Sequence, residues 1–230
     1  AQGQFNEPWG IAISDDGTVY VADTWNHRIQ AFDPEGVPIN SWGSFVSTEG
    51  GLGQPGVFWG PRGIAIDSSG NLLVTDTGNK RVEVFDPDGV FITQFGGGGV
   101  EAGFLEEPVG IAVGPDGSIY VADTWNQRIQ KFDSDYQFVR EWPVPGWEGD
   151  DLFNKPYLAV DQAGKIYAAD PTGWRVLVWT GEGEPVAVLG QFGAGPSEFA
   201  FVNGIHTAPD GSIWVADANN HRLMRFEPVQ

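Results

Sequence analysis

The sequence contains no cysteine, which excludes disulfide bonds, thiolate metal sites and a cysteine nucleophile. It also has no apolar run near the roughly 18 residues that a membrane-spanning helix needs. Long windows with helical periodicity are missing too, which argues against an α-helical fold. Prolines and glycines are frequent instead, at 16 and 33 residues, as expected of a chain that turns every few residues.

Basic residues are scarce. Twelve Lys and Arg stand against 31 Asp and Glu, giving a net charge of −19 and no basic cluster. Neutralisation of phosphates supplies most nucleic-acid affinity, so we predict no nucleic-acid partner. The acidic loop at residues 147–151 lacks the regular ligand spacing of calcium loops, and the three histidines form no recognisable set. We therefore predict no metal and no cofactor. An extracytoplasmic or secreted location stays open.

One thirteen-residue segment occurs twice in nearly identical form: YVADTWNHRIQAF begins at Tyr20, and YVADTWNQRIQKF begins at Tyr120. Three looser copies begin at Leu73, Tyr167 and Trp214. A short apolar run precedes each copy, and these runs begin at residues 10, 63, 110, 157 and 204. The chain therefore consists of five tandem units, the first of which is six residues longer than the others.

Each unit predicts four short strands. In the first unit, GIAIS, TVYVADT, RIQAF and VPINSWG are separated by the turn signals SDDG, TWNH and DPEG. Four strands in about 45 residues are typical of a β-propeller blade. The sequence therefore predicts an all-β fold, a single β-propeller domain over residues 1–230 with four-stranded antiparallel blades.

The repeated pattern resembles the NHL repeat family. The resemblance rests on G-I-A-(I/V), then D-G, then Y-V-A-D-x-x-N-x-R-(I/V)-x-x-F, and it extends over essentially the whole chain. The fourth unit departs from it, with Gly173 and Trp174 in place of Asn and a polar residue. The resemblance implies a propeller, usually of six blades.

The fifth unit contains only three of the four strands, because EPVQ follows its third strand. We predict a five-bladed propeller with an incomplete last blade, closed by packing between its first and fifth blades. An incomplete six-bladed ring, with a gap filled by a partner molecule, is the alternative. The third strand of that blade carries Leu223 and Met224 at an open edge, which invites pairing with another chain. A monomer, strand exchange and an edge-paired dimer all stay open.

Every unit repeats an Asp and an Arg five residues apart. A catalytic group needs one special environment, whereas a residue needed by every blade recurs in every blade. We interpret these pairs as structural, with the Asn between them adopting positive φ. The pairs are Asp23/Arg28, Asp76/Arg81, Asp123/Arg128, Asp170/Arg175 and Asp217/Arg222.

Ten tryptophans are many for this length, and several lie in turns or loops where no strand needs them. The second turn of a blade and the connection to the next blade emerge on the same side of a propeller. We therefore predict a ligand-binding face around the central channel. It comprises Trp9, Trp25, Phe58, Trp59, Arg62, Trp125, Trp147, Trp174 and Asn203.

These features favour a non-catalytic module that binds a peptide, a protein or a carbohydrate, with acidity favouring a basic or neutral partner. Two alternatives stay open. One is a lactonase- or lyase-like propeller enzyme with a metal in its channel, and the other is a structural or engineered repeat scaffold.

Overall fold

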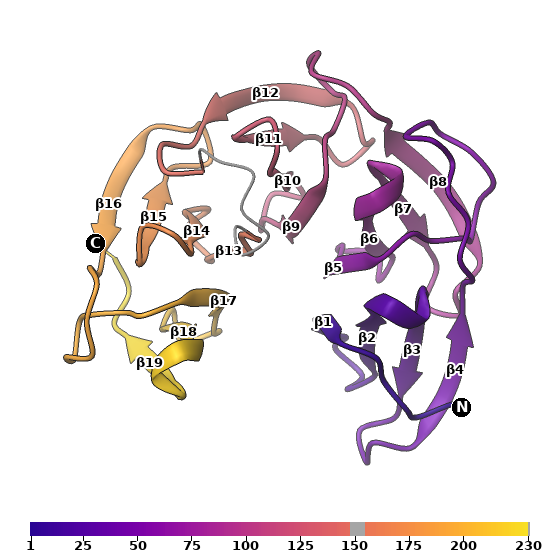
Figure 1. Ribbon diagram of the computed structural model, residues 1–230, viewed down its shortest axis with the longest axis horizontal. Helices are drawn as coiled ribbons and strands as arrows, with labels where there is room; N and C mark the ends of the chain where they lie inside the picture. Colours follow the sequence, from indigo (N-terminus) through magenta and orange to yellow (C-terminus); the bar gives the residue numbers. More distant parts are fainter. Residues whose placement is uncertain (148–154, 230) are drawn as a thin grey trace. The chain divides into compact units, whose positions relative to one another are not determined.

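The computed structural model describes residues 1–147 and 155–229. Their strands form five antiparallel sheets, which are the blades of a β-propeller (Figure 1). Within each blade the strands pair in sequence order. In the described part of the chain, no helix is long and apolar enough to cross a membrane.

The first two blades have four strands each. Blade 1 consists of β1 (Pro8–Ile13), β2 (Val19–Asp23), β3 (Arg28–Phe32) and β4 (Pro38–Trp42). Blade 2 consists of β5 (Pro61–Ile66), β6 (Leu72–Asp76), β7 (Arg81–Phe85) and β8 (Phe91–Gly96).

Two further blades also have four strands. Blade 3 consists of β9 (Pro108–Val113), β10 (Ile119–Asp123), β11 (Arg128–Phe132) and β12 (Phe138–Pro143). Blade 4 consists of β13 (Leu158–Val160), β14 (Ile166–Asp170), β15 (Arg175–Trp179) and β16 (Pro185–Leu189).

Among the described residues, blade 5 consists of three strands, β17 (Val202–Thr207), β18 (Ile213–Asp217) and β19 (Arg222–Phe226). The three strands predicted for the fifth unit are therefore confirmed. The inner strands also begin within two residues of their predicted starts. Local sequence suffices for this, because alternating β-branched and aromatic residues between Gly- and Asp-containing turns specify short strands and tight hairpins.

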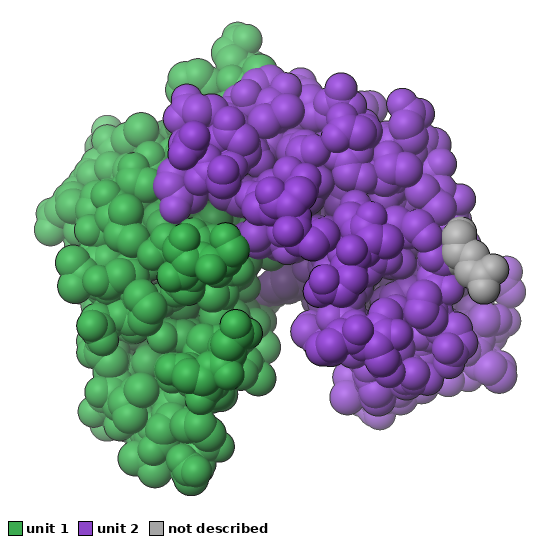
Figure 2. Space-filling view, turned by 180° about the vertical axis from the view of Figure 1, so that it is seen from behind, with its two compact units in different colours: residues 1–111 green, residues 112–230 purple. Residues whose placement is uncertain are grey.

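The chain divides into two compact units, residues 1–111 and 112–230 (Figure 2). The boundary falls within β9. In unit 1, one core cluster joins the facing sides of blades 1 and 2, and its fully buried members include Ile29, Phe58 and Leu72. In unit 2, one cluster joins blades 3 and 4 and another joins blades 4 and 5. Apolar packing between adjacent sheets thus holds each unit together.

Candidate binding surface

The turn between the second and third strands has the same backbone in blades 1, 2 and 5. A three-residue 3₁₀ helix is followed by a residue in the left-handed region: His27, Lys80 or His221, with φ of 52–60°. Gln127 and Trp174 have the same positive φ in blades 3 and 4. The expectation that the preceding Asn takes positive φ was wrong. Its side chain instead donates to the repeated Asp, as Asn79 does to Asp76 at 2.8 Å.

In blades 1, 2 and 5 the repeated Asp and Arg form a hydrogen-bonded clasp between the blade and the loop that enters it. All five Asp side chains are buried, and each accepts a hydrogen bond from the Arg Nε at 2.7–2.9 Å. In blades 1, 2 and 5 the other carboxylate oxygen accepts a backbone N–H of the incoming loop, such as that of Trp59 on Asp76 at 2.7 Å. The Arg bonds loop carbonyls, such as that of Val57 in blade 2. These contacts satisfy buried charges at the same place in the three blades.

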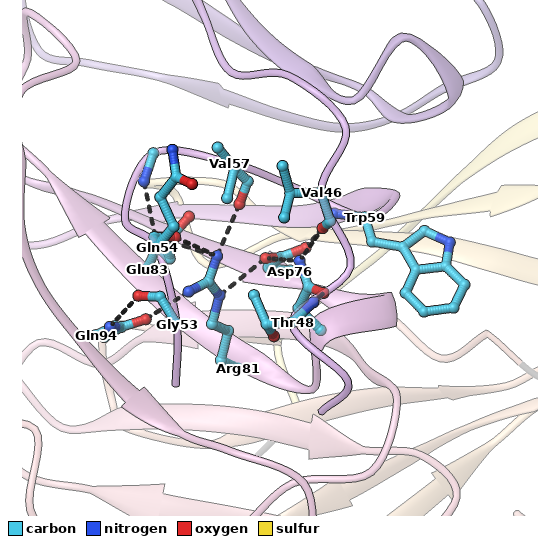
Figure 3. Close-up of polar contacts among 12 residues, drawn as sticks. Val46, Thr48, Gly53, Gln54, Val57, Trp59, Asp76, Arg81, Glu83 and Gln94 are labelled. Carbon is cyan, nitrogen blue, oxygen red and sulfur yellow. Dashed lines mark hydrogen bonds and ion pairs between the residues drawn. The ribbon is translucent and has the colours of Figure 1, made fainter. Parts of the chain in front are cut away.

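Blade 2 contains the most buried version of this clasp (Figure 3). Arg81 is fully buried and donates to Asp76, to Gln94 and to two loop carbonyls. The longer loop before this blade is fastened by Asn79, which donates to the carbonyl of Val46 at 2.9 Å and accepts the N–H of Thr48 at 2.7 Å. The six extra residues are thus anchored to the turn of blade 2.

Glu83 is a buried carboxyl group beside this clasp. Its Oε1 accepts the N–H of Gly56 at 3.0 Å and lies 3.5 Å from Arg81. Its Oε2 has no hydrogen-bond partner among the described residues. Burial raises the pKa of Glu83 to about 7, although the Arg81 charge acts in the opposite direction. Burial likewise raises the pKa of Asp76.

A row of aromatic rings, each in contact with the next, lies across the loops of unit 1. Trp25 lies 6.2 Å from His27, His27 lies 4.8 Å from Phe45, and Phe45 lies 6.2 Å from Trp59, all between ring centroids. Trp25, Phe45 and Trp59 are exposed, and His27 is half-buried. We call these four residues the unit 1 aromatic cluster. Its neighbouring rings are tilted or perpendicular, which is the favourable geometry for aromatic pairs.

Trp59 lies over the turn of blade 2 because that turn has a glycine. A Cβ on Gly78 would come within 2.5 Å of the Trp59 ring and 2.7 Å of its carbonyl oxygen. Gly78 also donates its N–H to that carbonyl at 2.8 Å. The slot that holds Trp25 in blade 1 is therefore covered in blade 2 by a tryptophan from the incoming loop.

Trp9 and Arg62 lie together on β1 and β5. The guanidinium carbon of Arg62 is 4.8 Å from the centroid of the Trp9 ring, a cation–π contact. Nearby on blade 1, the indole N–H of Trp25 donates to Glu7 at 3.0 Å. Trp9, Trp25, Arg62 and Trp59 thus all belong to unit 1.

Unit 2 repeats part of this arrangement. Trp174 takes the turn position that His27 takes in unit 1, and its ring lies 5.0 Å from Phe192, the counterpart of Phe45. Both rings are exposed, as are Trp125 and Asn203. The contribution of these unit 2 residues to a binding face stays a prediction.

Two residues of the predicted face are buried, and that part of the prediction was wrong. Phe58 belongs to the core between blades 1 and 2, where its ring packs against Phe85. Trp147 belongs to the core of unit 2 and donates its indole N–H to the carbonyl of Ala169 at 3.0 Å. Apolar rings in loops fill the space between adjacent sheets as readily as they face solvent. Most of the acidic loop at residues 147–151 lies outside the described residues.

Sequence reasoning missed Phe45 and Phe192. Both follow a fourth strand and form an isolated bridge to the next loop, at the position that Gly98 holds in blade 2. An exposed Phe where a sister unit has Gly was the available signal. Among the described residues, no three His, Asp or Glu side chains gather as a metal site would require. His206 is exposed on β17.

Comparison with known proteins agrees with the repeat pattern. The NHL repeat model matches four segments, residues 5–32, 58–85, 105–132 and 199–226. The chain belongs to the NHL repeat family. Each matched NHL segment ends with the third strand of its blade. Blade 4 lies outside these segments, and it is the blade in which the N–H of Gly173 replaces the usual Asn side chain on the repeated Asp.

B-box type zinc finger protein ncl-1 of Caenorhabditis elegans is 31% identical over 41% of this chain, which thereby spans 16% of that protein. Among solved structures, virginiamycin B lyase from Staphylococcus aureus matches 96% of this chain and 69% of its own, with a TM-score of 0.63 and 16% identity. A chain of a nidogen/laminin complex matches 96% of this chain and 75% of its own, with a TM-score of 0.66 and 18% identity. The likeness to the solved structures shows the fold alone.

Proposed function

We propose that this NHL-repeat propeller is a binding module whose unit 1 aromatic cluster recognises a segment of a partner protein. The observation that supports this most is the run of exposed rings from Trp25 to Trp59. Neighbouring exposed aromatic rings on loops are a common feature of binding sites. The scaffold does not require the Trp25 ring, because Thr172 and Asn219 hold its slot in blades 4 and 5.

The ring geometry favours a protein partner over a carbohydrate. A sugar stacks on one open flat ring, whereas two of the three ring pairs here are close to perpendicular, at 88° and 89°. Alternating edges and faces leave notches that suit apolar side chains, and tryptophan is enriched among binding hot spots. The net charge of −19 favours a neutral or basic partner segment. The related propeller chain of the nidogen/laminin complex comes from an assembly of proteins.

A displayed-peptide library, selected on the wild-type protein, tests this proposal. The selected peptides are then measured against a Trp25→Ala/Phe45→Ala/Trp59→Ala variant. We expect binding at least about tenfold weaker, because two or more ring contacts are lost. The melting temperature should change little, since the three side chains are exposed.

Trp214→Ala is the matched control, because Trp214 is an exposed tryptophan on blade 5, outside the cluster. Peptide binding should be unchanged in this variant. Equal losses in the control and the triple variant would contradict the assignment to the cluster. Selective binding of an oligosaccharide on a glycan array, without peptide binding, would instead support a carbohydrate ligand.

A further inference from the structure

Glu7 is an exposed residue at one end of the unit 1 aromatic cluster. Its Oε2 accepts the indole N–H of Trp25 at 3.0 Å. Among the described residues, Glu7 forms no ion pair with a Lys or Arg. A carboxylate can accept several hydrogen bonds besides that of the indole. A negative charge with capacity for a further partner is therefore held beside an exposed aromatic ring.

The backbone at Glu7 suits glycine better than glutamate. Its φ is 48°, in the left-handed region where side chains other than glycine are strained. Gly60 holds the same position in blade 2, with a φ of 65°. The backbone therefore does not account for a glutamate here, and the reason for it lies in its side chain.

The glutamate recurs together with the tryptophan. In blade 3, Glu107 has a φ of 47° and precedes Trp125 by the same 18 residues that separate Glu7 from Trp25. Neither residue type occurs at these positions in the other three units, whose corresponding pairs are Gly60/Gly78, Asn154/Thr172 and Phe201/Asn219. The two side chains occur together or not at all, which indicates that they act as one unit.

The exposure of the ring is a property of the turn. Trp25 is 43% exposed, and Trp125 is 46% exposed although other blades precede and follow blade 3 in the sequence. The same 3₁₀ turn forms without tryptophan in blades 2 and 5. Folding of the turn thus requires neither the ring nor the carboxylate that holds it.

A carboxylate bonded to an indole edge creates a site for a cation. The ring face attracts a cation through its quadrupole, and the carboxylate adds a charge-assisted hydrogen bond beside it. A guanidinium suits both groups, because it is planar, stacks on aromatic faces and has several N–H donors. Unit 1 contains such a stack, with the guanidinium carbon of Arg62 at 4.8 Å from the centroid of the Trp9 ring.

We propose that Glu7 and Trp25 together bind the guanidinium of an arginine in the partner segment. This inference rests on the proposed function, because Trp25 belongs to the unit 1 aromatic cluster. It adds that one anchor of the segment is cationic, while Phe45 and Trp59 receive apolar side chains. The net charge of −19 attracts a segment of this kind.

Two displayed-peptide libraries, one complete and one lacking arginine and lysine, are selected on the wild-type protein. We expect binders from the complete library, each with a required arginine. Replacing that arginine with citrulline, its neutral isostere, should weaken binding at least about fivefold in fluorescence anisotropy. In Glu7→Gln, the arginine peptide should bind with a similar loss, and citrulline should cost less than about twofold more.

Glu7→Gln isolates the charge, because the oxygen of its carboxamide still accepts the indole N–H. Its melting temperature should equal that of the wild type, since Glu7 is exposed. Glu35→Gln is the matched control, because it removes the same charge from an exposed turn of blade 1. Its affinity for the arginine peptide should stay within about twofold of wild type.

Several results would overturn the inference: equal citrulline effects in wild type and Glu7→Gln, equal losses in Glu7→Gln and Glu35→Gln, or a required lysine that arginine cannot replace. Equally tight binders from the library without basic residues, lost in Trp25→Ala/Phe45→Ala/Trp59→Ala, would overturn it and leave the proposed function intact. Failure of both libraries to yield a binder would contradict both.

Discussion

At the scale of single residues, one carboxyl group distinguishes blade 2 from its sisters. Gln30 and Gln130 hold the position of Glu83 in blades 1 and 3, and each donates to the repeated Asp at 3.0 and 2.9 Å. Gln30 also accepts the N–H of Gly3, as Glu83 accepts that of Gly56. An ionised Glu83 still accepts the N–H of Gly56, but it has no proton to donate to Asp76. Its negative charge is therefore repelled by the nearby Asp76 carboxylate.

We expect stability to fall as the pH rises from about 4.5 to about 7. The pKa of Glu83 is raised from 4.5 to about 7 in the folded protein, so the folded state binds this proton more tightly than the unfolded chain does. The stabilisation is present below pH 4.5 and is lost once the pH passes the folded pKa. Glu83→Gln should remove this dependence and raise the unfolding free energy at pH 8 by roughly 1–3 kcal/mol.

Urea denaturation of the wild type and Glu83→Gln at pH 5 and pH 8 measures the effect. Glu35→Gln, at an exposed turn, is the control and should behave as the wild type does. A stability difference between wild type and Glu83→Gln that is the same at both pH values would contradict the titration of Glu83.

Arg128→Ala should destabilise the protein by roughly 1–3 kcal/mol. Arg128 is buried and bonds Asp123 at 2.7 Å and Glu141 at 2.8 Å. Its removal leaves the buried Asp123 carboxylate without its charged partner. Thermal unfolding measures the loss. An unchanged melting temperature combined with impaired binding would point to a functional role for the pair.

At the scale of elements, the turn between the second and third strands keeps the same backbone in different blades but carries different side chains. The 3₁₀ turns Thr24–Asn26 and Thr77–Asn79 end in left-handed residues with almost the same φ, yet one carries Trp25 and the other Gly78. The backbone is fixed by the repeated Asp, Asn and Arg, whose side chains point inward. The outward position is therefore free to vary, and the loop that arrives beside it decides what fits.

Gly78→Ala should destabilise blade 2 by roughly 1–3 kcal/mol, because the new Cβ would overlap the Trp59 ring and its carbonyl oxygen. The displaced Trp59 ring should also shift the tryptophan fluorescence. Asn219→Ala makes a change at the same slot of blade 5, where the side chain is exposed, and should alter stability by less than about 0.5 kcal/mol. Equal effects of the two substitutions would contradict the role assigned to Gly78.

At the scale of the whole molecule, the first repeat differs from the internal ones in its inner strand. Ile11 is 64% exposed on β1, whereas the equivalent Ile64 and Ile111 are 7% and 5% exposed on β5 and β9. The repeat pattern gives these three residues the same role. Ile64 is buried because it belongs to the core cluster that joins blades 1 and 2.

A cysteine introduced at Ile11 should therefore react rapidly with a maleimide. One introduced at Ile64 should react slowly, since it becomes accessible only on local opening. The chain has no other cysteine, so labelling reports on the introduced thiol alone. Slow labelling at both positions, measured by mass spectrometry, would contradict the exposure of β1.

The sequence alone determined the repeat, the strands and the turns. These depend on local patterns, in which alternation, turn residues and hydrogen-bonding side chains act within a few positions of one another. The five Asp–Arg pairs were identified in the same way, because their partners lie five residues apart on neighbouring strands.

The tertiary structure decided which aromatic residues face solvent. Phe58 is buried and its neighbour Trp59 is exposed, although both belong to the same loop. Phe45 belongs to the unit 1 aromatic cluster because the fold places its loop beside the turn of blade 1, where its ring contacts His27. Burial of a loop side chain depends on the sheet that packs against it, and that contact joins residues far apart in the chain. Only the packed blades fix it, because local sequence does not encode the neighbour.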